Sequence, residues 1–313
     1  MECFEKEKFD LPIEGLHLGS AESLHPEQTV LEAVRMMQTR HFGSVLITKD
    51  DQLVGILTEK DLLKKIPSDG VDLAGLKVEE IMTPDPISLN KQDNIRTALL
   101  KMIRHDFRHL PILYPSEKVR MLSAKDILKF IVDGFPKSVY ALGMTSAKEL
   151  YIEDAHDDAF AKEILESTGK FIGQSTFWLP LMKVISNDCL SLDITTPLEV
   201  VLEKMQKNNC EAAIITDFET EVRGIITERD FLFKVFGKKI LGQRHEVCRY
   251  MTPDPDSLLA KHKIAYAINN MFTRNYRHVV IVNEDGHPLS LISLLDILSF
   301  ISRRLILSPS AVE

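Results

Sequence analysis

Apolar residues follow two different spacings along the chain, and each spacing predicts one kind of element. The segment TVLEAVRMMQTRH, residues 29–41, carries apolar side chains three or four positions apart, which predicts a helix with one buried face. GSVLIT and LVGILT are short β-branched runs separated by the polar KDDQ, the pattern of two strands joined by a turn. TEKDLLKKI then returns to helical spacing. With a short strand in front, the predicted unit is strand, helix, strand, strand, helix.

This unit recurs along the chain. GILTEKD at 55 returns as GIITERD at 224, MTPDPISL at 82 as MTPDPDSL at 251, and DFRHLPIL at 106 as NYRHVVIV at 275, each 169 residues later. Each half is doubled again, because Ser-Leu pairs stand at 23, 88, 191 and 257, followed 35 or 36 residues later by a hydroxyl residue with aspartate three positions on. Such internal repeats decide the fold before any single motif does. The chain therefore contains four copies of one unit, arranged two by two.

The repeats predict the domain organisation. We expect a first domain over 1–134, with units at 11–70 and 78–134, and a second over 179–305, with units at 179–240 and 247–305. Residues 135–178 form an acidic, mostly helical insert, and 306–313 a tail. One unit is too small to cover its own sheet, so two should pack together. The expected fold class is α/β (α+β), with two modules of two βαββα units packed sheet to sheet.

The four hydroxyl-x-x-aspartate motifs, with an Arg-His pair before a strand in units two and four, resemble the CBS motif. Two such motifs form a CBS pair, or Bateman module, and the resemblance covers about four fifths of the chain. It implies that AMP, ADP or ATP binds between the two units of a module, with aspartate on the ribose and the hydroxyl residue on ribose or phosphate. The residues that match are Thr58, Asp61, Ser123, Asp126, Thr227, Asp230, Ser293 and Asp296.

Basic residues strengthen the expectation of a phosphate ligand, because phosphates prefer Arg and Lys donors. The resemblance implies phosphate contacts at two places in each unit. The residues there are Lys60, Arg108, His109, Lys125, Arg229, Arg277 and His278. Units one and three carry Gly43-Ser44 and Glu211-Ala212 in place of Arg-His, and the fourth unit has Leu295 in place of the cation before aspartate.

Two other interpretations remain open for these residues. A hydroxyl residue followed three positions later by an acid is close to a helix capping box, which stabilises a helix start without any ligand. The second interpretation is that Arg108 and Arg277 are solvated arginines in weak surface ion pairs. Capping and phosphate binding are compatible, because the first N–H groups of a helix attract anions.

Composition excludes several classes of function. The formal charge of -8 argues against a general nucleic-acid binder. The four cysteines are scattered and the amino terminus is charged, which favours a cytoplasmic protein without a membrane span or a disulfide framework. The chain shows no GxSxG, P-loop, GxGxxG or HExxH motif, so we expect no enzyme activity. AHDDAF in the insert is expected to be a solvated face and not a metal site.

The expected function is therefore that of a stand-alone regulatory protein. An adenine nucleotide would alter the packing of one module against the other, and a regulated partner protein, unidentified here, would respond. The resemblance implies that the modules stack into a flat disc, either within one chain or across a homodimer. The alternative is a ligand-free scaffold whose CBS modules mediate only dimerisation or interaction.

Overall fold

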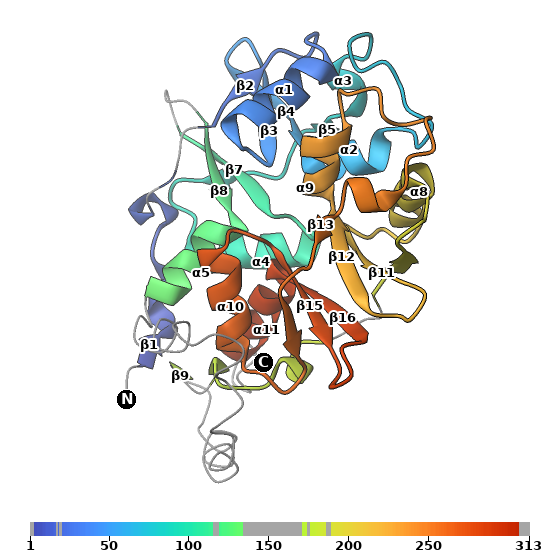
Figure 1. Cartoon of the computed structure of the whole chain (residues 1–313). Helices are drawn as coiled ribbons and strands as arrows, with labels where there is room; N and C mark the ends of the chain where they lie inside the picture. Colours follow the sequence, from blue (N-terminus) through green and yellow to red (C-terminus); the bar gives the residue numbers. More distant parts are fainter. Residues whose placement is uncertain are drawn as a thin grey trace.

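The computed structural model describes residues 3–16, 18, 21–114, 119–133, 171–173, 176–185 and 189–306. Four small α/β units surround a common centre (Figure 1). The predicted fold class is confirmed. Most of the helical insert predicted over 135–178 lies outside the described residues, namely 135–170 with its AHDDAF segment and 174–175, as does the tail from 307.

Each unit has the predicted order of strand, helix, strand, strand and helix. The first contains β2 (Ser23–Leu24), α1 (Val30–Arg40), β3 (Ser44–Lys49), β4 (Gln52–Thr58) and α2 (Glu59–Lys65). The second contains β6 (Leu89–Asn90), α4 (Ile95–His105), β7 (His109–Leu113), β8 (Arg120–Ser123) and α5 (Ala124–Asp133). The third contains β10 (Ser191–Asp193), α8 (Leu198–Lys207), β11 (Ala212–Thr216), β12 (Val222–Thr227) and α9 (Glu228–Asp230), which continues as the π-helix η7 (Phe231–Val235). The fourth contains β14 (Ser257–Leu259), α10 (Ile264–Thr273), β15 (His278–Val282), β16 (Pro288–Ser293) and α11 (Leu294–Ile306).

Shorter elements complete the described chain. A two-stranded antiparallel sheet joins β1 (Cys3–Glu5) to β9 (Phe171–Gly173). The remaining helical elements are α3 (Val78–Ile81) and the 3₁₀ turns η1 (Lys6–Asp10), η2 (Ile13–Gly15), η6 (Leu181–Lys183) and η8 (Val247–Arg249).

Strand register places the start of one strand beside the end of the next in every unit. The first strand of a unit pairs in parallel with the second, and the second pairs antiparallel with the third. The hydroxyl residue at the end of the third strand lies opposite the first residue of the second strand. These pairs are Ser44 with Thr58, His109 with Ser123, Ala212 with Thr227, and His278 with Ser293. The register therefore brings the two predicted phosphate positions of a unit to one edge of its sheet.

Each MTPDP segment adds a short strand to the sheet of the odd-numbered unit that it follows. β5 (Thr83–Pro84) pairs with β4, and β13 (Thr252–Pro253) pairs with β12. Met82 packs so closely on Gly55 that a Cβ there would lie 2.3 Å from its Sδ. The extended conformation predicted from the two prolines is found, and the segments also close the edge of the sheet.

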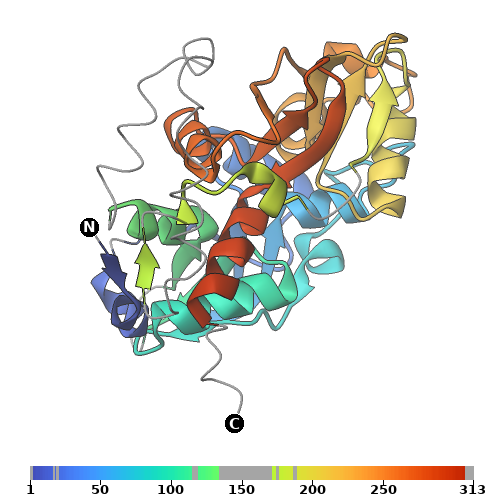
Figure 2. The ribbon, with the colours of Figure 1, turned by 90° about the horizontal axis from the view of Figure 1, so that it is seen from below.

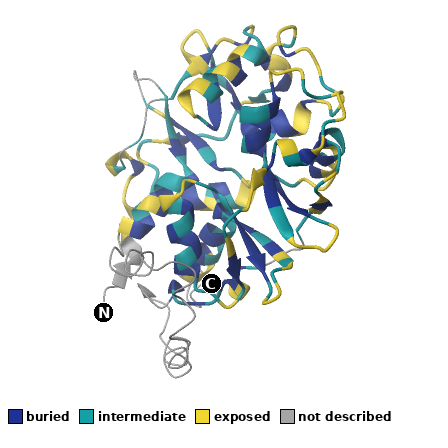
Figure 3. Cartoon of the chain, in the orientation of Figure 1, coloured by how far each residue is buried: buried dark blue, intermediate teal, exposed yellow. Residues whose placement is uncertain are grey.

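The hydrophobic cores cross the boundary between the two modules. One buried cluster joins units one and three, with Val34 and Leu62 from the first and Leu202 and Phe231 from the third. A second cluster joins units two and four, where α11 packs against α4 and α5 (Figure 2). Buried residues accordingly line the inner faces of these helices (Figure 3). The two modules thus pack together within the chain.

Within the second module, the predicted sheet-to-sheet packing is visible as a separate small core. It joins Ile214 and Ile225 of unit three to Leu259, Val280 and Val282 of unit four. This face of each sheet looks toward its partner unit, while the other face is covered by helices. Each unit is therefore buried on two sides, as expected for a half-sized α/β piece.

Candidate functional site

Each of the four predicted aspartates lies in the first turn of a helix and helps to cap its start. Thr58 donates its N–H and its hydroxyl to Oδ2 of Asp61, at 3.0 and 2.6 Å. Ser123 does the same to Asp126, at 2.8 and 2.7 Å. The remaining two pairs, Thr227 with Asp230 and Ser293 with Asp296, repeat the geometry. The capping interpretation is therefore confirmed in every unit, and it occupies one carboxylate oxygen of each aspartate.

The second oxygen distinguishes odd from even units. In unit one, Oδ1 of Asp61 accepts hydrogen bonds from Lys65 at 2.9 Å and Thr83 at 2.8 Å. Asp230 repeats this in unit three, with Lys234 and Thr252. Within the described part of the chain, Oδ1 of Asp126 and Oδ1 of Asp296 make no such contact. The even units therefore retain a free acceptor where the odd units have used theirs.

Among the described residues, the motifs of units one, two and three each adjoin a cleft. The first cleft holds about 540 Å³ and is lined by Thr58, Lys60 and Asp61 of unit one and by Arg108 and His109 of unit two.

The second cleft holds about 390 Å³ beside Ser123 and Asp126. Its cations come from both modules, and they are Arg108, Lys125, Arg229 and Arg277.

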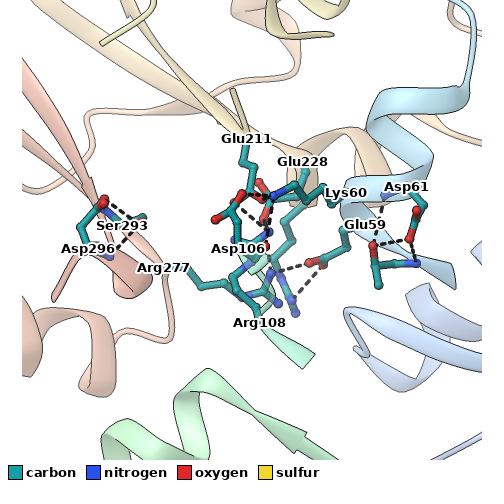
Figure 4. Close-up of polar contacts among 12 residues, drawn as sticks. Glu59, Lys60, Asp61, Asp106, Arg108, Glu211, Glu228, Arg277, Ser293 and Asp296 are labelled. Carbon is teal, nitrogen blue, oxygen red and sulfur yellow. Dashed lines mark hydrogen bonds and ion pairs between the residues drawn. The ribbon is translucent and has the colours of Figure 1, made fainter. Parts of the chain in front are cut away.

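The third cleft holds about 330 Å³ beside Thr227 and Asp230, with Arg229, Arg277 and His278. The structure thus brings all the predicted residues to these three clefts except Ser293 and Asp296, which lie apart from the central charged side chains (Figure 4).

The predicted arginines meet buried glutamates where the modules join (Figure 4). Arg108 contacts Glu228 at 2.6 Å and Glu211 at 3.2 Å. Arg277 binds Glu59, and it also lies 3.3 Å from Glu228. Because Glu59 and Glu228 are each 1% exposed, the proposed solvated surface pair is wrong for these arginines. We call these five side chains, together with Lys60 and Arg229, the central charge cluster.

Lysine and arginine side chains of the hydroxyl motifs extend the central charge cluster. Lys60 contacts Glu211 at 2.8 Å and binds Asp106. Arg229 lies 3.3 Å from Glu59 and packs over the ring of Phe233 at 5.0 Å. Four of the predicted phosphate-binding cations, Lys60, Arg108, Arg229 and Arg277, are therefore already paired with carboxylates, whereas Lys125 donates to the amide oxygen of Asn275.

Burial and the neighbouring cations have opposite effects on the pKa values of the glutamates in the central charge cluster. Burial raises the pKa of Glu228 to about 7, although Arg108 opposes the shift. At Glu211 burial also favours the neutral acid, but Arg108 and Lys60 outweigh it and lower the pKa to about 2. Glu228 differs because Glu211 and Glu59 add to the effect of its burial, whereas Lys60 lies 2.8 Å from Oε1 of Glu211. Among the described residues, Oε2 of Glu228 is also buried without a hydrogen-bond partner, a costly arrangement for a charged oxygen.

The two histidines are held neutral. Burial, with Arg108 and Arg277 adding to it, lowers the pKa of His278 to about 3 and lowers that of His109 well below its ordinary value. Neither ring is therefore a cationic phosphate ligand at neutral pH.

Glu211, Glu228 and His278 present ligand atoms within 4.8 Å of one another, close enough to surround a metal ion. Arg108 and Lys60 already supply positive charge to these carboxylates. We therefore assign the group to ion pairing, because a divalent cation there would face two positive side chains.

A family model describes the repeated unit directly. The model of the CBS domain matches residues 20–68, 78–133, 181–237 and 246–303, which is more than half of the chain. The chain belongs to the CBS-domain family. It contains four CBS domains, so the resemblance seen in the sequence is confirmed.

The relatives that match most of this CBS-domain protein are longer than the chain. It is 26% identical over 293 residues to the CBS domain-containing protein CBSCBSPB2 of Arabidopsis thaliana, covering 91% of the chain and 52% of that protein. The meiotically up-regulated gene 70 protein of Schizosaccharomyces pombe is 22% identical, covering 93% of the chain and 43% of that protein. The chain spans about half the length of the curated relatives that it matches.

A solved structure shares the whole architecture. Protein MJ1225 of Methanocaldococcus jannaschii, proposed to be an archaeal homologue of g-AMPK, superposes with a TM-score of 0.70 at 15% identity. The match covers 93% of this chain and 100% of that chain. At this identity the similarity establishes the fold of the four CBS domains and nothing about their ligands.

The glutamates of the cluster were not predicted, although the sequence contained a signal. Glu59 and Glu228 directly follow the hydroxyl residue in CBS domains one and three, where domains two and four have Ala124 and Leu294. The even domains instead carry Arg-His before a strand. Acidic residues recur at one position of the odd domains, and basic residues recur at another position of the even domains. This alternation indicates that odd and even domains pair with each other through these residues.

In the described segments, no helix combines the length and the apolar character that a membrane crossing requires.

Proposed function

We propose that this CBS-domain protein is a regulatory protein that binds an adenine nucleotide in the second cleft and passes its occupancy to a partner protein. One observation carries the proposal. Among the described residues, one carboxylate oxygen of Asp126 has no partner, and it lies beside a 390 Å³ cleft lined by Arg108, Lys125, Arg229 and Arg277. A carboxylate acceptor next to clustered cations suits a ribose diol attached to phosphate.

The rest of the second cleft suits a nucleotide as well. Ser123 lies at the start of α5, a ten-residue helix whose first N–H groups favour an anion. Apolar side chains of both CBS domains offer surface for a base. They include Phe42, Met121 and Leu128. The polar and apolar halves of a nucleotide would therefore meet matching walls.

The odd-numbered motifs are weaker candidates. Both oxygens of Asp61 are occupied, by Thr58 on one side and by Lys65 and Thr83 on the other. A ribose in the first cleft would have to share Oδ1 with two existing donors. We therefore place the principal site at Ser123 and Asp126, and treat the first and third clefts as secondary.

The family and the fold support the wider role that we propose. We propose a non-enzymatic protein, because the described clefts present cations and caps and no nucleophile with an adjacent base. Cys210 and Cys248 are not in disulfides, which fits the proposed cytoplasmic location. Dimerisation between two chains is a separate proposal, because the described cores already join the two modules of one chain.

A second candidate function is a ligand-free scaffold. It is favoured by the finding that every hydroxyl-aspartate pair caps its own helix, so that stability alone accounts for the motif. The scaffold would use the same packed modules as a rigid surface for partners.

Titration with adenosine, AMP and ATP separates the two candidates. Asp126→Asn keeps an oxygen for the helix cap and removes the charged acceptor, so AMP affinity should fall about tenfold or more, equivalent to about 1.4 kcal/mol. Asp133→Asn, an exposed change of equal charge on the same helix, is the matched control and should bind as the wild type does. Absence of binding by all three compounds would favour the scaffold.

A further inference from the structure

Glu59 and Arg277 meet at the wall between the first and second clefts. Glu59 lines the first cleft, Arg277 lines the second, and Gly43 lines both. A Cβ added to Gly43 would lie 2.9 Å from Nη2 of Arg277 and 3.0 Å from Oε2 of Glu59. The ion pair therefore packs directly against the backbone of Gly43, and a side chain at this position would have to displace the ends of both partners.

Glu59 forms ion pairs with two cations of the second cleft from outside that cleft. It binds Arg277, and Arg229 lies 3.3 Å from its Oε1. Both arginines come from the second module and both line the second cleft, whereas Glu59 does not line it. Glu59 is 1% exposed, so solvent screens its charge less than it would screen a surface carboxylate.

A phosphate in the second cleft would need the same guanidinium groups. An arginine can donate to two anions at once, but its single positive charge is then shared between them. Each phosphate oxygen that approaches Arg277 or Arg229 meets charge that Glu59 has already partly neutralised. The neutral part of a nucleotide is not affected by this competition.

Building on the nucleotide site proposed above, we propose that Glu59 is an internal competitor of the ligand's phosphate and sets the affinity of the second cleft for phosphorylated compounds. It acts through Arg229 and Arg277 and does not itself contact the ligand, so it is a positioning residue. Removing its charge should strengthen phosphate binding selectively.

Calorimetric titration of the full chain tests this at pH 8 and fixed salt. Glu59→Gln should bind AMP and ATP about tenfold more tightly than the wild type, a gain of about 1.4 kcal/mol, and adenosine within about twofold. Glu79→Gln is the matched control. It removes the same charge from an exposed side chain paired only weakly with Lys77, 3.6 Å away, and should change nothing.

Several outcomes would overturn the proposal. Unchanged AMP and ATP affinities in a folded Glu59→Gln, or an equal gain in Glu79→Gln, would each do so. If Glu59→Gln does not fold, Glu59→Asp shortens the reach to Arg277 and should give a smaller gain in the same direction. No gain there would count against the proposal.

Failure of the nucleotide site can be recognised separately. If adenosine, AMP and ATP bind to none of these proteins, the proposed function fails, and inorganic pyrophosphate becomes the probe. Tighter pyrophosphate binding by Glu59→Gln than by the wild type would support the competition, and equal binding would overturn it.

Discussion

Arg108 of the second CBS domain donates to Oε1 of Glu228 in the third at 2.6 Å, and the two side chains are 8% and 1% exposed. The contact crosses from one module to the other. Removing such charges from water costs several kcal/mol, which their attraction recovers only while both partners remain. Burial would lower the pKa of Arg108, but Glu228, Glu211 and Glu59 outweigh it and raise that pKa.

Loss of Arg108 should therefore destabilise the whole protein. Arg108→Met keeps most of the side-chain volume but leaves Glu211 and Glu228 without their shared cation. At pH 8, where Glu228 is ionised, unfolding by urea should show a loss of about 3–5 kcal/mol. Arg223→Met is the control, because Arg223 pairs with Asp217 at the surface with 43% of its side chain exposed. That change should cost less than about 1 kcal/mol. Similar losses in both variants would contradict a special role for burial.

The raised pKa of Glu228 predicts a specific dependence of stability on pH. In the folded protein this carboxyl keeps its proton up to about pH 7, whereas the unfolded chain has the ordinary value of 4.5. The proton therefore stabilises the fold below the ordinary pKa, and that contribution is lost as the pH rises through about 7. Desolvation is the main cause, and Glu211 and Glu59 add to it.

Glu228→Gln removes this titration. Relative to the wild type, the free energy of unfolding of the variant should rise by up to about 1.4 kcal/mol per pH unit between pH 4.5 and about 7, and then level off. His278, whose pKa is lowered, has the opposite dependence, but it is present in both proteins and largely cancels. Urea titrations at several pH values measure the difference. Glu221→Gln, an exposed control, should give a flat difference.

The sequence predicted the units because their spacing is a local property, whereas the central cluster is not. Thr58 and Asp61 belong to one helix start, and their relation is fixed by three residues of chain. Glu59 meets Arg277 across 218 residues, so only the packing of one module on the other brings them together. The predicted cations were thus identified correctly as a group, but their carboxylate partners depend on tertiary contacts.

The same limit explains the difference between odd and even aspartates. The hydroxyl-x-x-aspartate pattern is equal in all four CBS domains, so the sequence gives Asp61 and Asp126 equal roles. Thr83, which occupies Oδ1 of Asp61, arrives from the linker strand β5. No comparable strand follows domain two within the described residues. A linker therefore decides which carboxylate stays free.

These contacts predict unequal stability effects at equivalent positions. Asp61→Ala removes the cap and the contacts to Lys65 and Thr83, so it should cost about 2–3 kcal/mol, whereas Asp126→Ala should cost about 1 kcal/mol. Thr83→Val, which deletes one hydrogen bond, should cost about 1 kcal/mol in the wild type and almost nothing beside Asp61→Ala. Chemical denaturation measures all four proteins. Equal losses at Asp61 and Asp126 would show that the linker contact contributes nothing.

The shared cores predict that the two modules unfold as one body. Leu298 on α11 is fully buried in the cluster that joins CBS domains two and four. Leu298→Ala should cost about 2–5 kcal/mol through lost burial and a residual cavity. Leu289→Ala, on the neighbouring strand β16 but 47% exposed, should stay within about 0.5 kcal/mol. The sequence has a single tryptophan, Trp178. Because each core draws on both modules, the fluorescence of Trp178 and far-UV circular dichroism should report one coincident transition in every variant. Two separated transitions, with Leu298→Ala shifting only one of them, would mean that the modules fold independently despite their common core.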